Sequence, residues 1–241
     1  MGNAVILCYH ALSERWSSEL SITPERFERQ LTLLKRRGYR GVTFRDAVQA
    51  QNGKVMSVTF DDAYRSVLEL AEPILTALDC PATVFVPTNF PAVRVPMSWA
   101  GIDEWIGGPD EPELMPLTWD ELRGLAERGW EVASHTRSHP RLTQLDDTSL
   151  AAELSESREI CEAELGGPCE SLAYPYGDVD ERVIDATARA GYRQAAGLPA
   201  RWHSEDPLNW PRVGVYHRDP EWRFRLKVSP TVRRLRLLAN R

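Results

Sequence analysis

Seven short apolar runs alternate along the chain with longer segments of mixed character. Each run has the length of a buried strand, and several are rich in β-branched residues. Runs this apolar are typical of strands covered on both faces. The predicted strands cover residues 5–9, 55–60, 81–86, 130–134, 171–176, 193–198 and 212–216.

The segments between these runs have helical spacing. In residues 23–38, Thr23 is placed to cap a helix, Phe27, Leu31 and Leu34 share one face, and Gly38 ends it. The predicted helices cover residues 23–38, 64–79 (with Pro73 inside or between two pieces), 118–129, 147–167 and 180–191.

Strands separated by helices of this length are expected to pair in parallel through right-handed crossovers. The alternation therefore predicts an α/β fold, either a barrel or an open doubly wound sheet. In both architectures, chemistry gathers where strands end and loops begin. The residues that follow each strand are thus the first place to look for a site.

Composition narrows the class of protein. The chain has 241 residues, of which 42% are hydrophobic and 27% charged, as expected for a globular protein, and we treat residues 1–241 as one domain. The net charge of −6 argues against nucleic acid as a partner. No apolar run has the length of a membrane span, and the N-terminus lacks the pattern of a signal peptide. We expect a cytoplasmic location for the sequence as written, or an extracytoplasmic one if a leader has been removed. The four cysteines have no CxxC spacing and are expected to be reduced.

Acidic and imidazole side chains follow two of the central strands. Asp61 and Asp62 come directly after residues 55–60, and His135 and His139 follow residues 130–134. Adjacent carboxylates are ordinary in turns and helix caps, and an HxxxH spacing alone is weak evidence for a metal. Together, two histidines and one aspartate would make a three-ligand site with an open position, as in catalytic metal sites. The second aspartate could then act as a base.

The segments TFDD, SHTRSHP and AYPYG, in this order, resemble the central motifs of the polysaccharide deacetylase family. This is the NodB-homology group, also called carbohydrate esterase family 4. The resemblance extends from about Val5 to Val215. It implies a distorted (β/α) barrel, a divalent metal (zinc first, with Co²⁺, Ni²⁺ or Fe²⁺ as alternatives) and hydrolysis of N-acetyl or O-acetyl groups on sugars.

The resemblance also implies a role for each matching residue. Asp61 resembles the catalytic base, and Asp62, His135 and His139 resemble the metal ligands. The backbone N–H of Tyr176 resembles the donor to the oxyanion and would also contact substrate. The metal would polarise the acetyl carbonyl and acidify a water, from which Asp61 takes a proton.

One departure from the family pattern concerns the cation that holds the base. Many members carry an arginine two residues before the proline of the third motif, where this chain has Ala173. We predict that Arg212, on the last predicted strand, replaces it. Surface pairing or helix capping is the alternative for Arg212. We expect its replacement by alanine to reduce turnover heavily with little loss of fold.

The second departure concerns the acid that protonates the leaving amine. Family members of the common order have a histidine near the C-terminus, where His217 is the candidate. The YH that ends the first predicted strand resembles a permuted order, which favours His10. A satisfied core imidazole is the alternative, and His203 is expected to lie on the surface.

Two further segments suggest contacts. A proline-rich loop insertion at about 88–117 holds Trp99 and Trp105, which could stack on sugar rings or simply anchor the loop. The basic tail at about 222–241 is expected to be a helix that closes the barrel, with weak contact to an anionic membrane surface as the alternative.

These observations predict a metal-dependent hydrolase that removes the N-acetyl group from an N-acetylhexosamine unit in a glycan. An alternative keeps the chemistry and moves it to a small acetylated sugar or a lipid-linked precursor inside the cell. A non-catalytic glycan-binding relative is the alternative outside enzymes, favoured only by Ala173. Iron oxygenases also use two histidines and a carboxylate, but the β/α alternation disfavours their usual fold.

Overall fold

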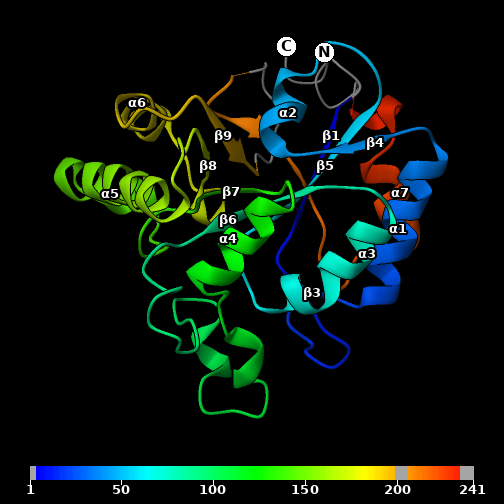
Figure 1. Cartoon of the computed structure of the whole chain (residues 1–241), viewed down its shortest axis with the longest axis horizontal. Coiled ribbons are helices and arrows are strands. Elements are labelled where there is room, and N and C mark those ends of the chain that lie inside the picture. The colour runs from blue at the N-terminus through cyan, green and yellow to red at the C-terminus, as the bar shows by residue number, and fades with distance from the viewer. Residues whose placement is uncertain (1–3, 199–205, 234–241) are drawn as a thin grey trace.

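The computed structural model describes residues 4–198 and 206–233, which form a parallel barrel surrounded by helices (Figure 1). Every pairing in its main sheet is parallel, as the alternation predicts. The barrel strands are β1 (Val5–Tyr9), β5 (Val55–Phe60), β6 (Ala82–Val86), β7 (Glu131–Ser134), β8 (Ser171–Ala173), β9 (Gln194–Gly197), β10 (Trp210–Pro211) and β11 (Val213–Gly214).

The barrel is nearly closed by the last stretch of extended chain. β10 pairs with β9 at one end of the sheet, and β11 pairs with β1 at the other. Arg212 lies between β10 and β11, so this one residue marks the point where the chain passes from one edge of the sheet to the other. The prediction of a distorted (β/α) barrel is confirmed, with the first and last strands as neighbours.

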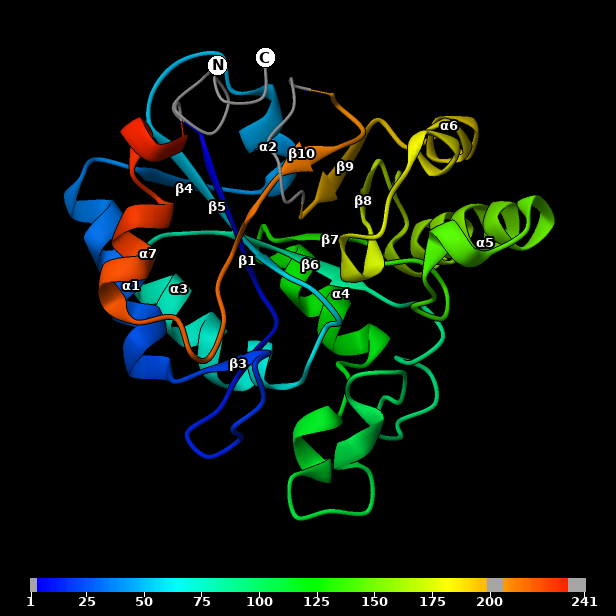
Figure 2. The ribbon, with the colours of Figure 1, turned by 180° about the vertical axis from the view of Figure 1, so that it is seen from behind.

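Helices cover the outside of the barrel. Seen from the opposite side, α5 and α6 flank one side, and α1, α3 and α7 flank the other (Figure 2). The side chains of Thr23, Thr118, Asp146 and Asp180 cap the N-termini of α1, α4, α5 and α6. The helices are α1 (Pro24–Arg36), α2 (Phe44–Gln49), α3 (Glu72–Ala77), α4 (Trp119–Glu127), α5 (Asp147–Leu165), α6 (Glu181–Arg189) and α7 (Glu221–Lys227).

Alternation along β1 separates two apolar cores. Val5, Leu7 and Tyr9 join the large core between sheet and helices, whereas Ile6 joins a smaller cluster with Phe85. Side chains two residues apart on a strand point to the same face, so Cys8 is directed to the side of the sheet that holds Ile6. The cluster that holds Ile6 and Phe85 also contains small residues, Ala133, Ala173 and Ala196 among them.

Some elements differ from the sequence prediction. The strand predicted at 171–176 stops at Ala173, because Pro175 begins a 3₁₀ turn (Pro175–Gly177) in which Tyr176 has a φ of 59°. The helix predicted at 64–79 becomes a π-helical turn (Val67–Ala71) followed by α3, with Pro73 in the first turn of α3. β4 (Arg40–Val42), α2 and the pair β2 (Ala11–Leu12) and β3 (Ser21–Ile22) had not been predicted.

The predicted insertion forms a lobe at the lower edge of the molecule in Figure 1. It contains two short 3₁₀ helices (Asp103–Trp105 and Glu111–Leu114). Met97, Ile102 and Leu114 pack with Trp16 and Tyr64 in a third, small cluster. The lobe is therefore anchored beside β2 rather than extended into solvent.

The tail begins as predicted with a helix on the barrel. Phe224 of α7 is fully buried, while Trp222 and Leu226 are exposed. The rest of the tail, residues 234–241, lies outside the described residues, as does His203. Across residues 4–198 and 206–233, none of the helices combines the length and the hydropathy needed to cross a membrane.

All four cysteines are buried free thiols, as predicted.

Candidate functional site

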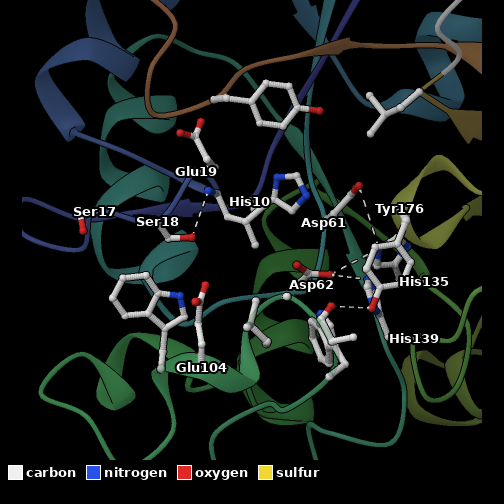
Figure 3. A pocket seen from close by; sticks show the side chains of 18 of the residues that line it. His10, Ser17, Ser18, Glu19, Asp61, Asp62, Glu104, His135, His139 and Tyr176 are labelled. Atoms are coloured by element: carbon white, nitrogen blue, oxygen red, sulfur yellow. Dashed lines mark hydrogen bonds and ion pairs between the residues drawn. The ribbon is translucent and has the colours of Figure 1, made fainter.

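All of the predicted site residues except Arg212 line one cavity of about 570 Å³ at the C-terminal ends of the strands (Figure 3). His10 follows β1, and Asp61 and Asp62 follow β5. His135 follows β7, and His139 lies four residues further on. The barrel thus brings together residues that are up to 166 positions apart, from His10 to Tyr176.

The backbone at the site is locally strained. Asp62, Ala63, Thr136, His139 and Tyr176 all have positive φ between 58° and 70°. A non-glycine residue in this region costs free energy and persists where surrounding contacts enforce it. Asp62 and His139, two of the three predicted metal ligands, adopt this conformation. The other three residues lie in the turns that follow the strands around the site.

Asp62, His135 and His139 form a compact set of possible ligands. Asp62 Oδ1 lies 3.4 Å from His135 Nε2 and 3.2 Å from His139 Nε2. Two ligand atoms about 2.1 Å from a tetrahedral zinc ion are separated by about 3.4 Å. The three side chains are buried, and their ligand atoms lie within 4.8 Å of one another.

The hydrogen bonds around this set leave its inner atoms available. His135 Nδ1 lies 2.8 Å from the carbonyl oxygen of Ala173, a contact that requires a proton on Nδ1 and leaves the Nε2 lone pair facing Asp62. Asp62 Oδ1 accepts no well-formed hydrogen bond from any described residue, although it is fully buried. An unpaired buried carboxylate oxygen opposite two imidazole nitrogens fits a divalent cation.

The neighbouring imidazoles also set the charge of Asp62. Burial raises its pKa, but the positive charge that His139 and then His135 can carry outweighs this effect and holds the pKa below its usual range. Asp62 is therefore ionised at neutral pH, as a metal ligand must be.

Arg212 forms a two-pronged ion pair with Asp61. Its Nη1 donates to Asp61 Oδ1 at 2.6 Å and its Nη2 to Oδ2 at 2.8 Å, with both side chains almost wholly buried. Nη1 also donates to Thr59 Oγ1 at 3.0 Å. Burial raises the pKa of Asp61, but the guanidinium of Arg212 and then His135 bring it down to about 2. The contact predicted for Arg212 is therefore present in the structure.

The contact also changes one expectation about Arg212. Because the guanidinium is buried against an ionised carboxylate, its removal would leave Asp61 buried without a partner. Replacement by alanine should therefore cost considerable stability, contrary to the small loss of fold expected from the sequence.

His10 lies in the cavity and faces Asp61 (Figure 3). Its Nδ1 is buried and has no hydrogen-bond partner among the described residues. Burial lowers the pKa of His10, and the charges of Asp62 and Asp61 act against that effect. His217 does not line this cavity, although its neighbours Tyr216 and Arg218 do; its backbone N–H donates to the Glu19 carbonyl, and its Nδ1 lies 3.5 Å from Ser21 Oγ. The geometry thus favours His10 over His217 as the acid.

The three aromatic residues predicted to contact substrate all line the cavity. Trp99 stacks on His139 with ring centroids 4.2 Å apart, and Trp105 packs edge-on against Trp16. The Tyr176 hydroxyl donates to the Ala100 carbonyl at 3.1 Å, which joins the lobe to the barrel. Both interpretations of the tryptophans are compatible with these contacts, because each residue anchors the loop and also faces the cavity.

Glu153 is a residue that the sequence analysis missed. It lies on α5, is 5% exposed, and accepts hydrogen bonds from the backbone N–H groups of Arg137 and Ser138, each at 2.9 Å. Its other oxygen accepts from the Ser138 hydroxyl. These bonds fix the turn between His135 and His139. Glu153 shares the buried face of α5 with Leu150 and Ser157, and this helical spacing was the available signal in the sequence. The many other charged residues of α5 obscured it.

A parallel barrel with two histidines and two aspartates at its C-terminal mouth places the chain among the (β/α) barrel proteins that carry their site at this end. The particular family follows from comparison with known proteins. A family profile described as polysaccharide deacetylase matches residues 48–195, more than half of the chain. The chain belongs to the polysaccharide deacetylase family.

Individual relatives are distant. YxkH of Bacillus subtilis (strain 168) is 24% identical over 194 residues, which are 78% of this chain and 62% of that protein. The poly-beta-1,6-N-acetyl-D-glucosamine N-deacetylase of Staphylococcus epidermidis is 25% identical over 211 residues, 81% of this chain and 68% of the relative. The chain thus spans less than two thirds of the length of YxkH.

A solved structure shows the same fold. The Streptococcus pyogenes deacetylase PplD, in complex with acetate, superimposes with a TM-score of 0.78 at 22% identity, over 94% of this chain and 98% of PplD.

Proposed function

We propose that this protein is a metal-dependent deacetylase that hydrolyses the N-acetyl group of an N-acetylhexosamine unit in a glycan. One observation carries the proposal: an ionised carboxylate, Asp61, is held by Arg212 directly beside the ligand set Asp62, His135 and His139. Asp61 Oδ2 lies 4.0 Å from His135 Nε2. A base and a cation site this close together suit hydrolysis by an activated water.

Asp61 would accept the proton of the attacking water. Arg212 keeps this carboxylate ionised and fixes its orientation through two hydrogen bonds. A carboxylate with a pKa of about 2 is a weak base, so the water that it deprotonates must already be acidified. A divalent cation bound by Asp62, His135 and His139 would supply that acidity and polarise the acetyl carbonyl.

His10 would protonate the departing amine. It lines the cavity beside Asp61, and its imidazole would carry the proton to substrate. Tyr176 lies at the 3₁₀ turn after β8, and its backbone N–H would stabilise the oxyanion. The proton taken by Asp61 and the proton given by His10 together balance amide hydrolysis.

The assignment of an N-acetylhexosamine rests on the relatives and on the cavity. The Staphylococcus epidermidis relative is named for N-deacetylation of a polymer of N-acetyl-D-glucosamine. The cavity of about 570 Å³ falls within the size range of small-molecule sites and is lined by Trp99, Trp105 and Tyr176. Aromatic faces of this kind suit the apolar faces of sugar rings.

Acetate release tests the proposal. The purified chain would be incubated with polymeric and monomeric N-acetylhexosamines, with chelator and then with Zn²⁺ restored. We expect metal-dependent release from a glycan, and no release by Asp61→Asn, a variant that retains the shape of the carboxylate. Release from monomers alone would favour the small-sugar alternative. If the metal-restored protein releases acetate from none of the substrates, the proposal is wrong.

A further inference from the structure

A second group of potential metal ligands lies beside the first. It consists of Cys8, His10 and Asp61, whose ligand atoms lie within 4.8 Å of one another. Cys8 is on β1, two residues before His10, and no role described above uses it. Its Sγ donates a hydrogen bond to Asp61 Oδ2 at 3.5 Å.

The geometry of this group fits a thiophilic ion. In a tetrahedral zinc site with a Zn–S bond of about 2.3 Å and a Zn–O bond of about 2.1 Å, sulfur and oxygen are about 3.6 Å apart. The observed separation of Cys8 Sγ and Asp61 Oδ2 is 3.5 Å. His10 contributes a third donor, and its buried Nδ1 lacks a hydrogen-bond partner within the described residues. His10 and Asp61 face each other across the cavity in Figure 3.

We propose that Cys8, His10 and Asp61 form a second, inhibitory site for thiophilic divalent cations such as Cd²⁺ and excess Zn²⁺. An ion bound there would replace the thiol proton of Cys8, which is released to solvent. The ion would occupy both the base and the acid of the proposed reaction. Thiolate ligation distinguishes this site from the oxygen and nitrogen donors of the first site.

Charge makes the second site the weaker one. A first ion would lie beside two aspartates and one guanidinium, which leaves only one net positive charge. A second dication adds two positive charges against the single thiolate that it creates, beside Arg212 and the first ion. Burying uncompensated charge is costly, so the second ion should bind only when metal is in excess. The site would therefore act as an inhibitory site rather than as part of the resting enzyme.

Binding can be measured without activity. Protein that already holds one equivalent of Zn²⁺ would be titrated with Cd²⁺ while the sulfur-to-metal charge-transfer absorption in the near ultraviolet is recorded. We expect a band that saturates at one further equivalent in the wild-type chain and is absent from Cys8→Ser. Mn²⁺, which prefers oxygen ligands, should give neither the band nor inhibition at the same concentration.

A matched control separates Cys8 from the other thiols. Cys80→Ser also replaces a buried cysteine, but one that lies outside the cavity, and it should keep the band. If Cys8→Ser does not fold, Cys8→Ala serves in its place. Should both be unstable, His10→Gln in the wild-type thiol background should weaken Cd²⁺ binding by at least about tenfold. A band that persists in Cys8→Ser, or an unchanged affinity in His10→Gln, would overturn the proposal.

The inhibitory consequence rests on the proposed deacetylase function, whereas the absorption experiment does not. In an acetate-release assay, excess Zn²⁺ should inhibit the wild-type chain at a concentration at least about tenfold lower than Cys8→Ser. A chain without activity but with the Cys8-dependent band would refute the proposed function and leave the second site standing. An active chain without the band would refute the second site and leave the proposed function standing.

Discussion

The pair of Arg212 and Asp61 allows a quantitative test, because both partners are buried. Arg212→Met keeps most of the side-chain volume and removes the charge. The guanidinium is 0% exposed, the carboxylate is 3% exposed, and two hydrogen bonds of 2.6 and 2.8 Å join them. Removing one partner of such a pair leaves an uncompensated buried charge, so the free energy of unfolding should fall by about 3–5 kcal/mol.

The pH dependence of this loss identifies its cause. In the wild-type chain the pKa of Asp61 is lowered from 3.8 to about 2, so its favourable contribution is present above pH 3.8 and lost as the pH falls towards 2. In Arg212→Met, burial without its cation raises the pKa of Asp61. The resulting penalty is full at neutral pH and vanishes once the carboxyl is protonated. The stability difference between the two proteins should therefore shrink as the pH falls.

Urea denaturation with chelator present measures the stability difference without a contribution from bound metal. The double variant Asp61→Asn/Arg212→Met removes both charges and should recover most of the stability that Arg212→Met loses. A loss below about 1 kcal/mol, within the range for exposed pairs, would refute the reasoning. So would a large loss that does not depend on pH or that persists in the double variant.

Three further predictions concern the metal and the acid. Glu153→Ala should weaken Zn²⁺ binding by about 10–100-fold in a competitive titration. Glu159→Ala, which changes an exposed acid on the same helix, should not, and equal effects would contradict a positioning role for Glu153. Zn²⁺ at a hundred times its dissociation constant should raise the free energy of unfolding of the metal-free chain by about 2.7 kcal/mol in denaturant titrations. A similar increase in Asp62→Asn would show that the ion binds outside the proposed ligand set. His10→Gln should lower kcat by about 10²–10⁴-fold and remove the alkaline limb of the pH profile of kcat. His217→Gln should retain activity. The opposite pattern would assign the acid to His217.

Local signals in the sequence predicted much of the fold. The apolar run at 55–60 coincides with β5, and Thr23 caps α1 where predicted. Predictions failed where tertiary pairing or a single backbone angle determines the element. β4 has three residues, one of them exposed, and exists because it pairs with the first half of β5. The end of β8 at Ala173 depends on the turn at Tyr176, which hydrophobic pattern does not encode.

The candidate site was predictable to the extent that its residues follow strands. Asp61, Asp62, His135 and His139 could be located because parallel strands carry their C-terminal ends to one mouth. The Ala173 carbonyl, which fixes the tautomer of His135, gives no sequence signal because every residue has a carbonyl. Cys8 was expected only to be a reduced thiol, because its contact with Asp61 depends on the register between β1 and β5.

The position of Arg212 connects the closure of the barrel to the state of the base. Its backbone lies where the chain leaves β9 for β1, and its N–H donates to the Gly197 carbonyl at 3.2 Å. Its side chain enters an interior lined by Ala133, Ala173 and Ala196, with the guanidinium 5.5 Å from the ring centre of Phe85. An arginine at position 173 would have to share that interior with this guanidinium. Ala173 therefore suits an interior that already holds the guanidinium of Arg212, and the segment that closes the barrel also holds the base.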